Sequence, residues 1–449
     1  MTNEPSIDPP NEPPLERFIV VWLGQMGSTI GSRMTAFAMV LWAWDLTEQA
    51  TAIALIGFFS QVPRMAMTPF AGVIVDCWNR KRLMMVGDTV AGVSTVVILG
   101  LHTTGHLALW HLYGAGAINA AFGQIQQLAY TTSMTLMVPQ RHYSRGVSLN
   151  FLSGYGAGIF APALAGSLYT IIGLSGILVI DLATFAIAIS TVIAIAIPQP
   201  TATPQSLNFT RLVKDISEGF RYIGARPGML GILVVAALFQ FAHEISNAVH
   251  SPMILARTQN SARALALVSA TSGIGGVIGA LLITLWGGPH RRIHGVLLGM
   301  SGAGLSKIGF SLGQGPGMWM PMQFFSSLNF PLLGSSGNAI WLSKVSPELQ
   351  GRVFSASLLI KGAASPLGRL VAGPLADRVF EPAMAPTGML APVLGGVFGV
   401  GAGAGMAILY LLSGSAMLLI GLGGYLYRPL RIVEDVLPDH QTQTCLKGE

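Results

Sequence analysis

Long apolar runs separated by short polar segments dominate this sequence. Each run is long enough to cross about 30 Å of hydrocarbon as an α-helix. The runs fall at 18–42, 51–75, 83–101, 107–133, 147–170, 174–197, 229–255, 264–286, 295–313, 317–341, 353–376 and 401–426. This pattern predicts an all-α membrane protein with twelve transmembrane helices, arranged as two pseudo-symmetric six-helix bundles at 17–197 and 229–428.

The remaining segments are polar. Residues 1–16 are rich in proline and acid and lack a basic leader region, so we expect a disordered cytoplasmic tail rather than a signal peptide. Residues 429–449 are expected to form a second cytoplasmic tail. The link at 198–228 opens with prolines and continues with apolar residues at helical spacing, which predicts an amphipathic helix on the inner membrane surface. It serves either as a tether between the bundles or as a partner-binding helix.

Composition agrees with a membrane protein. The chain is 51% hydrophobic and 10% charged, whereas a soluble domain has about 25% charged residues. A net charge of +6 suggests nucleic acid at first, but the cations lie in short loops. Seventeen Lys and Arg residues fall on one side of the predicted helices and three on the other. This bias predicts a multi-pass protein of the inner cell membrane with both termini cytoplasmic and no nucleic-acid partner.

A charged segment, Gly72 to Arg82, joins the second and third apolar runs. Asp76 and Arg80 are four residues apart, the spacing of an ion pair on one helix face, and Lys81 and Arg82 open the next run. Two interpretations follow from the charges alone. The segment is either a charged clasp between two membrane helices or a loop that only sets orientation.

The order Gly-x-x-x-Asp-x-x-Asn-Arg-Lys-Arg resembles the loop between helices 2 and 3 of the major facilitator superfamily. Gly72, Asp76, Arg80 and Lys81 match that pattern, while Cys77 replaces its usual first arginine. The resemblance implies the major facilitator fold and a cytoplasmic gate.

The two halves of the chain repeat at the next loop. Arg145 recurs 207 residues later as Arg352, and Ser148, Ala165, Gly166 and Leu168 recur at the same offset. We therefore expect a duplicated architecture and assign both arginines to the same gate. Chance matches among small residues are the alternative to duplication.

Two more stretches extend the resemblance. Gly158, Pro162 and Gly166 are similar to an element of helix 5 in facilitator antiporters, although ordinary small-residue packing explains them equally well. The stretches 343–355 and 372–384 resemble a bacterial exporter branch that includes the enterobactin exporter and macrolide-efflux proteins.

Charged residues inside apolar runs are the sharpest site hypotheses, since a charge at the membrane centre costs about 2.5 kcal/mol or more. Arg33 and Glu244 each lie fifteen residues after the start of equivalent runs. We expect the two to face one central cavity and to pair, with Glu244 carrying a proton and His243 as the alternative carrier. The alternatives are that Arg33 binds a backbone carbonyl and that His243 is only a packing residue.

Other intramembrane cations are less specific. Lys307 is expected to face lipid, whereas Arg64, Lys361 and Arg369 are either structural or attract anionic cargo. The remaining cavity wall is predicted from polar and aromatic residues within the runs, namely Gln124, Gln127, Asn329, Phe37 and Phe241.

The sequence contains no nucleotide-binding loop, no His-Glu-x-x-His motif and no Gly-x-Ser-x-Gly motif. Its two cysteines indicate no disulfide or metal framework. We expect a cofactor-free, metal-free monomer that exports a small amphipathic molecule by proton antiport. Solute import or lysophospholipid transport on the same fold is the alternative. A membrane-embedded enzyme using His243 and Glu244 is a more distant one.

Overall fold

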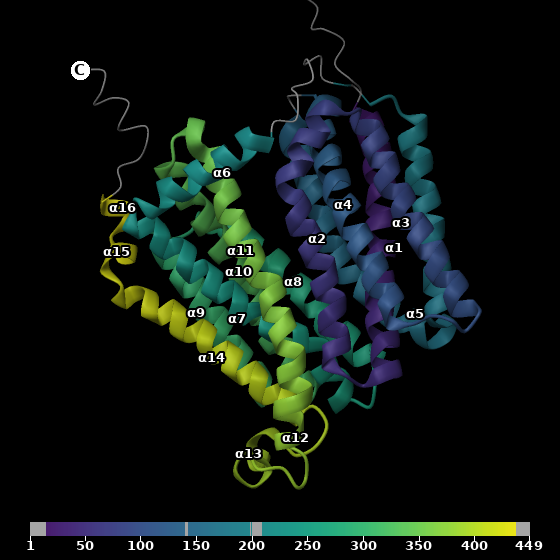
Figure 1. Cartoon of the computed structure of the whole chain (residues 1–449), viewed down its shortest axis with the longest axis vertical. Helices are drawn as coiled ribbons and strands as arrows, with labels where there is room; N and C mark the ends of the chain where they lie inside the picture. Colours follow the sequence, from purple (N-terminus) through teal and green to yellow (C-terminus); the bar gives the residue numbers. More distant parts are fainter. Residues whose placement is uncertain (1–14, 140–141, 198, 200–208, 437–449) are drawn as a thin grey trace, which may run out of the picture.

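Two groups of long helices stand side by side (Figure 1). The computed structural model describes residues 15–139, 142–197, 199 and 209–436, and the secondary structure of these residues is helical. The first half contains α1 (Leu15–Thr47), α2 (Ala50–Cys77), α3 (Arg80–Thr103), α4 (Leu109–Met137) and α5 (Tyr143–Ala194). The second half contains α7 (Pro227–Arg257), α8 (Ala262–Trp286), α9 (Arg292–Leu312), α10 (Pro316–Lys344), α11 (Pro347–Leu375) and α14 (Ala404–Leu426).

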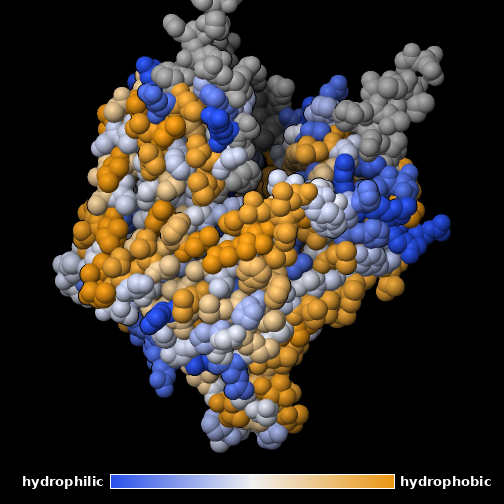
Figure 2. Space-filling view, turned by 180° about the vertical axis from the view of Figure 1, so that it is seen from behind, coloured by the Kyte–Doolittle hydropathy of each residue, from blue (hydrophilic) through white to orange (hydrophobic). Residues whose placement is uncertain are grey.

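The surface of these helices suits a bilayer. In the described part of the chain, seven helices are long and apolar enough to cross a membrane, namely α2, α3, α5, α7, α8, α9 and α14. Figure 2 shows hydrophobic residues over much of the middle of the molecule, with hydrophilic residues gathered towards its ends. The chain is therefore a multi-pass membrane protein.

Helix α5 changes direction at Gly173. This residue has φ 63° and ψ −168°, values that glycine adopts without a side-chain clash. The change of direction falls between the predicted runs 147–170 and 174–197. Each part of α5 is long enough to cross the bilayer separately.

Short helices mark the two ends of the molecule (Figure 1). Helix α6 (Phe209–Gly224) lies at one end, here called the α6 end. The π-helix η2 (Ala376–Phe380), α12 (Glu381–Ala383) and α13 (Ala391–Phe398) lie at the opposite end, here called the α13 end.

Two further short helices, α15 (Arg428–Arg431) and α16 (Val433–Val436), follow α14. Leu430 and Val433 are buried in the apolar core of the second half. The tail expected from residue 429 therefore begins with a packed segment, because these two side chains bury apolar surface. Most of the first expected tail, residues 1–14, and residues 437–449 lie outside the described residues.

The two halves meet along two helix pairs, α5 with α8 and α2 with α11. Glycines allow the close approach. A Cβ at Gly166 would overlap Ala266 of α8, and one at Gly373 would lie 2.6 Å from the Cα of Thr51. Both contacts lie towards the α13 end. At the α6 end, by contrast, a Cβ at Gly72 or Gly351 would meet no atom within 4 Å, and Figure 2 shows a notch between the two lobes there.

Candidate functional site

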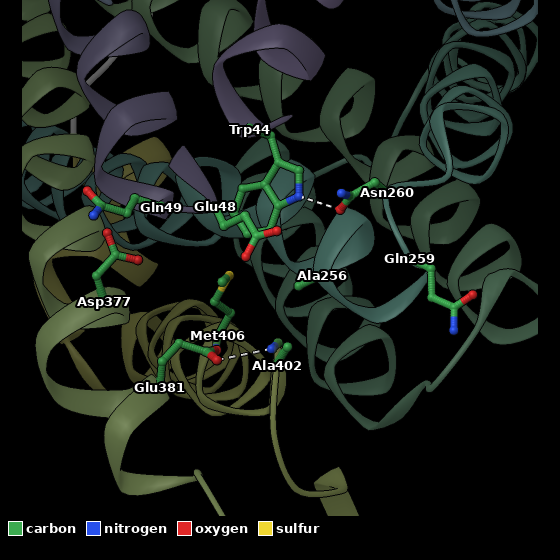
Figure 3. A pocket seen from close by; sticks show the side chains of 11 residues that line it. Trp44, Glu48, Gln49, Ala256, Gln259, Asn260, Asp377, Glu381, Ala402 and Met406 are labelled. Atoms are coloured by element: carbon green, nitrogen blue, oxygen red, sulfur yellow. Dashed lines mark hydrogen bonds between the residues drawn. The ribbon is translucent and has the colours of Figure 1, made fainter. Parts of the chain in front are cut away.

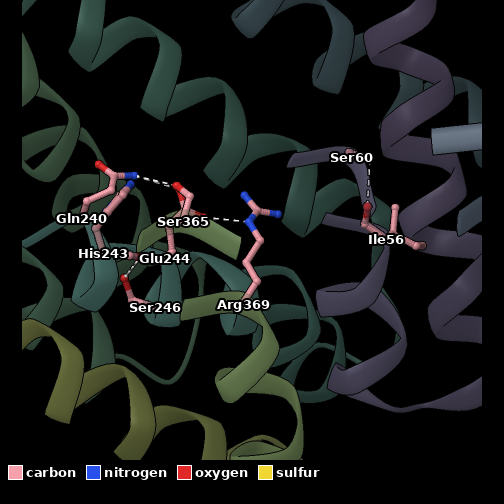
Figure 4. A network of polar contacts seen from close by, with 8 residues as sticks. All are labelled: Ile56, Ser60, Gln240, His243, Glu244, Ser246, Ser365 and Arg369. Carbon is pink, nitrogen blue, oxygen red and sulfur yellow. Dashed lines mark hydrogen bonds and ion pairs between the residues drawn. The ribbon is translucent and has the colours of Figure 1, made fainter. Parts of the chain in front are cut away.

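A buried carboxylate, Glu244, is the centre of a polar network between α7 and α11 (Figure 4). Its Oε1 accepts hydrogen bonds from Gln240 Nε2 at 3.0 Å and from Ser365 Oγ at 3.0 Å. Its Oε2 accepts from Arg369 Nε at 2.7 Å. Glu244 is 5% exposed, and these donors give its side chain the partners that a buried carboxylate needs.

Arg369 also reaches the other half of the molecule. A Cβ added at Gly57 of α2 would overlap the guanidinium of Arg369, and Figure 4 shows that guanidinium facing Ile56 and Ser60 of the same helix. Only glycine leaves this space open. The ion pair of the second half therefore lies at the interface between the two halves, here called the seam, which α5, α8, α2 and α11 form.

Arg33 lies in a cavity of about 580 Å³ between α1, α5 and α8. The other residues that line it are Asn150, Gly154, Tyr155, Gly158, Ser269, Ser272 and Gly273. A Cβ at Gly158 would lie 3.4 Å from Nη1 of Arg33. The cavity thus combines one cation with neutral polar groups and glycine backbone.

The expected pair between Arg33 and Glu244 is not formed. Glu244 turns towards α11, where Ser365 and Arg369 supply donors, whereas Arg33 points into the seam between α5 and α8. Sequence reasoning left Arg369 unassigned. The signal for it was the spacing of Lys361, Ser365 and Arg369, which at four-residue intervals form one polar stripe on α11.

His243 faces a different environment from its neighbour. Its ring lies 4.8 Å from that of Phe330 and is stacked on Phe239 at 6.3 Å. Nδ1 of His243 is buried and has no hydrogen-bond partner. The aromatic contacts match the packing alternative rather than a position beside Arg369.

Lys307 was expected to face lipid, and that expectation is wrong. The residue is 4% exposed, its Nζ donates to Tyr410 Oη at 3.3 Å, and the ammonium lies 4.9 Å from the centre of the Tyr410 ring. Helices α9 and α14 enclose it because glycines bring them close together. A Cβ at Gly304 would lie 2.5 Å from the backbone nitrogen of Leu418.

The predicted polar and aromatic wall is only partly assembled. Asn329 donates to Phe325 O at 2.7 Å, and its side chain fills the space beside Gly302 of α9, so it does not face the central seam. Phe37 packs against apolar clusters. Phe241 is half-buried where α7 passes Gly368. Gln124 is half-buried and Gln127 is exposed on α4.

The segment at 72–82 folds differently from the expected ion pair. Trp78 is extended, with φ −115° and ψ 157°, so Asp76 and Arg80 do not share one helix. Arg80 is buried and donates from Nη1 to Thr132 O at 3.0 Å, while Lys81 Nζ binds Ile193 O and Ile195 O at 2.8 and 3.0 Å. The contact expected between Asp76 and Arg80 is therefore replaced by bonds from the cations to backbone carbonyls.

The other residues expected to form the cytoplasmic gate make separate contacts. A Cβ added at Gly72 would meet no atom within 4 Å. The backbone N–H of Arg82 donates to Oδ1 of Asn79, the N-cap residue of α3, at 3.1 Å. Arg145 is exposed in the first turn of α5. Its counterpart Arg352 binds α6 through Asp215 at 3.0 Å and through Glu218. Arg352 thus ties α6 to α11.

The glycines of α5 lie on the seam. A Cβ at Gly273 of α8 would lie 3.2 Å from the carbonyl carbon of Gly158, and Gly166 touches Ala262 and Ala266. Pro162 stands between these glycines inside the helix, where it cannot donate to the carbonyl of Gly158. Small residues therefore bring α5 and α8 into backbone contact, as the packing interpretation predicts.

A second pocket of about 460 Å³ lies at the α13 end (Figure 3). Three carboxylates line it, those of Glu48, Asp377 and Glu381. Burial raises the pKa of the Glu381 carboxyl, and backbone N–H bonds from Met406 and Gly403 oppose this shift.

Contacts across the halves close the molecule beside this pocket. Asp377 accepts hydrogen bonds from the backbone N–H of Ala50 at 2.9 Å and of Thr51 at 2.8 Å, and from Thr51 Oγ1 at 2.5 Å. Trp44 Nε1 donates to Asn260 Oδ1 at 2.8 Å. A carboxylate of the second half therefore caps the first turn of α2.

A search against protein-family models decides the affiliation of this helical bundle. The model described as Major Facilitator Superfamily matches residues 21–368. The chain belongs to the Major Facilitator Superfamily. Members of this family and the relatives given below are membrane transporters, which rules out the enzyme interpretation.

The curated relatives of this superfamily member include efflux proteins. Macrolide efflux protein A of Streptococcus pyogenes is 25% identical over 368 residues, which cover 81% of this chain and 90% of the relative. Multidrug efflux pump Tap of Mycobacterium tuberculosis is 24% identical over 370 residues, with 76% and 83% covered. The chain is thus a facilitator whose relatives are exporters.

Solved structures share the fold. A mutant of the nucleoside transporter NupG has a TM-score of 0.71 at 13% identity, covering 91% of this chain and 98% of that structure. A bacterial homologue of the human lysosomal transporter Spinster, inward-facing and unoccupied, has a TM-score of 0.65 at 14% identity, with 91% and 96% covered.

Proposed function

We propose that this protein exports a small amphipathic organic molecule from the cell by exchange for protons. In this proposal the chain spans the inner cell membrane with twelve helices as a monomer, in two bundles at 17–197 and 229–428 joined by the link at 198–228. Both termini and the α6 end face the cytoplasm. The distribution of Lys and Arg and the efflux relatives support this orientation and direction.

The observation that carries the proposal is the position of the Glu244–Arg369 pair. Its carboxylate is buried in the second half, and its guanidinium abuts Gly57 of the first half. Proton uptake by Glu244 removes the charge that holds Arg369. The guanidinium then needs other acceptors, so the contact between α11 and α2 changes with protonation.

In the proposed cycle, the change between α11 and α2 is coupled to movement of the cargo through the molecule. Cargo enters the cavity of Arg33 from the α6 end, where the halves are apart, while the contacts of Asp377 and Trp44 close the α13 end. A rocking motion of the halves exchanges these two arrangements. The segment at 72–82, with Arg145 and Arg352, closes the cytoplasmic mouth when the α13 end opens.

The test is proton-coupled efflux in proteoliposomes loaded with a pH dye and supplied with a panel of dyes, macrolides and siderophores. Glu244→Gln keeps the shape of the side chain and one acceptor oxygen for Gln240 and Ser365, but it removes the titration and the acceptor that Arg369 Nε uses. We expect the variant to insert and fold while its cargo-driven proton flux falls to the level of protein-free vesicles. Glu348→Gln changes an exposed carboxyl at the start of α11 and is expected to behave as wild type. Normal coupling in Glu244→Gln would remove this carboxyl from the mechanism.

A further inference from the structure

The cavity of Arg33 contains no described carboxylate to balance its charge. Apart from Arg33, its lining consists of Asn, Tyr, Ser and Gly residues. Gly31 and Thr35, on the opposite face of α1, contact Asp181 instead. The guanidinium therefore points away from the acidic group that its own helix packs against.

A second cation, Arg64, lies on α2. It lies seven residues after Gly57 on α2, and thus two turns further along the helix face that meets Arg369. Arg64 and Arg33 are both exposed, and Met65, the residue after Arg64, contacts Gly362 of α11. Among the described residues, neither arginine lies within 4.0 Å of a carboxylate oxygen.

A third cation, Lys361, belongs to the polar stripe on α11. It lies one turn before Ser365 and is half-buried at the level where Gly362 meets Met65 of α2. It is likewise without a described carboxylate within ion-pair distance. Three helices of both halves thus bring unpaired cations to the seam.

The intramembrane carboxylates that the structure describes are already engaged. Glu244 binds Arg369. Asp181 accepts from Ser32, Thr35 and Thr95. Asp88 accepts from Gln25 and Gln126 inside the first half. Because these carboxylates already have partners, an anion that neutralises the three cations has to come from outside the chain.

We propose that the cargo is an amphipathic anion whose carboxylate or phosphate oxygens bind between Arg33 and Arg64, with Lys361 nearby. Arginine suits this role because its planar guanidinium binds such oxygens in pairs. The hydroxyls of Ser269, Ser272 and Tyr155 supply further donors around the cavity. This inference rests on the proposed transport function and specifies the chemical class of its cargo.

Matched fluorescent probes test the charge preference in nanodiscs that contain the purified protein. The probes are N-dansylglycine, its phosphate counterpart O-phospho-N-dansylethanolamine, neutral dansylglycinamide and cationic dansylethylenediamine. We expect at least one anionic probe to bind about tenfold more tightly than the neutral and cationic probes, as charge-assisted hydrogen bonds require. Comparing the two anions shows whether a carboxylate or a phosphate is preferred.

Variants then locate the preference. Arg33→Gln and Arg64→Gln are each expected to weaken binding of the anion about tenfold, whereas Arg33→Lys and Arg64→Lys retain most of it. The control Arg263→Gln, an exposed cation at the start of α8, should not change binding. Size-exclusion profiles and thermal stability report whether each variant is folded.

Three results would overturn the inference: equal or tighter binding of the cationic probe to wild type, no anion binding above protein-free nanodiscs, or an unchanged preference in both folded Gln variants. Flux measurements separate this from the transport proposal. Anion-selective binding without proton-driven flux leaves the inference standing and contradicts antiport. Proton-driven export of cationic probes alone contradicts the inference and leaves antiport standing.

Discussion

At Glu244, three donors surround a carboxylate that has almost no contact with solvent. The depth of this residue was predictable from the run that contains it, because an acid fifteen residues into an apolar segment must be buried or lie in a cavity. Its partner was not predictable. Arg33, Arg64 and Arg369 lie at comparable depth. Only the packing of α7 against α11 makes Arg369 the partner of Glu244.

Removing that partner should destabilise the protein. Arg369→Gln leaves a buried charge with two neutral donors, so we expect a loss on the order of 3 kcal/mol, as found when one member of a buried ion pair is removed. The measurement is thermal unfolding in detergent. The double variant Glu244→Gln with Arg369→Gln is expected to recover most of the loss. Losses that simply add would mean that the two side chains are not coupled.

For Lys307 we expect the opposite, namely that removal of the charge does not destabilise the protein. Its buried ammonium has one described hydrogen bond, to Tyr410. Lys307→Met keeps the length of the side chain and removes the charge, so we expect unchanged or higher thermal stability. Tyr410→Phe deletes the acceptor and is expected to cost about 1 to 3 kcal/mol. A clear loss of stability in Lys307→Met would show that the charge itself stabilises this core.

Among the elements, the helices and their order follow from apolar periodicity, but the contacts between them do not. The glycines of α5 were identifiable from sequence, since small residues at four- and eight-residue intervals indicate close helix packing. The contact of Asp377 was not, because the residue lies one position beyond the run 353–376, and the stretch 372–384 that contains it indicated only an exporter branch. Its role arises only when η2 brings it to the start of α2.

Asp377→Asn tests that contact. The amide accepts fewer hydrogen bonds from the start of α2 and carries no charge to complement the helix dipole, which together are worth about 1 kcal/mol. We therefore expect the population open at the α13 end to rise several-fold. Labelling of a single cysteine at position 51 by a membrane-impermeant thiol reagent measures this. Glu348→Gln serves as the charge-matched control, and equal labelling in the two variants would contradict a closing role for Asp377.

For the whole molecule, composition and patterning were sufficient for a multi-pass bundle, and the segment at 72–82 indicated the superfamily. The way the halves meet was beyond sequence reasoning. It depends on contacts between the halves, such as that of Gly57 with Arg369. Because glycine has no side chain, its part in such a contact produces no recognisable sequence pattern. The same limit explains why the expected pair of Arg33 and Glu244 is not formed.

Accessibility from the two sides should differ in the cargo-free protein. In a background with Cys77→Ser and Cys445→Ser, Gly72→Cys places a thiol where no atom lies within 4 Å of an added Cβ. Thr51→Cys places one against Gly373 and Asp377. We expect rapid labelling at position 72 in inside-out vesicles and slow labelling at position 51 in right-side-out cells. The reverse pattern would contradict the proposed orientation.

The acidic pocket at the α13 end has a kinetic consequence. Glu48, Asp377 and Glu381 give this opening a negative potential, which enriches cations, including protons, and depletes anions in the water beside it. An expelled anion would be driven off before it could return, while the exchanged proton would be gathered at the same mouth. Such an opening would slow rebinding of the released cargo and speed protonation, while the gradients across the membrane would still set the direction of net transport.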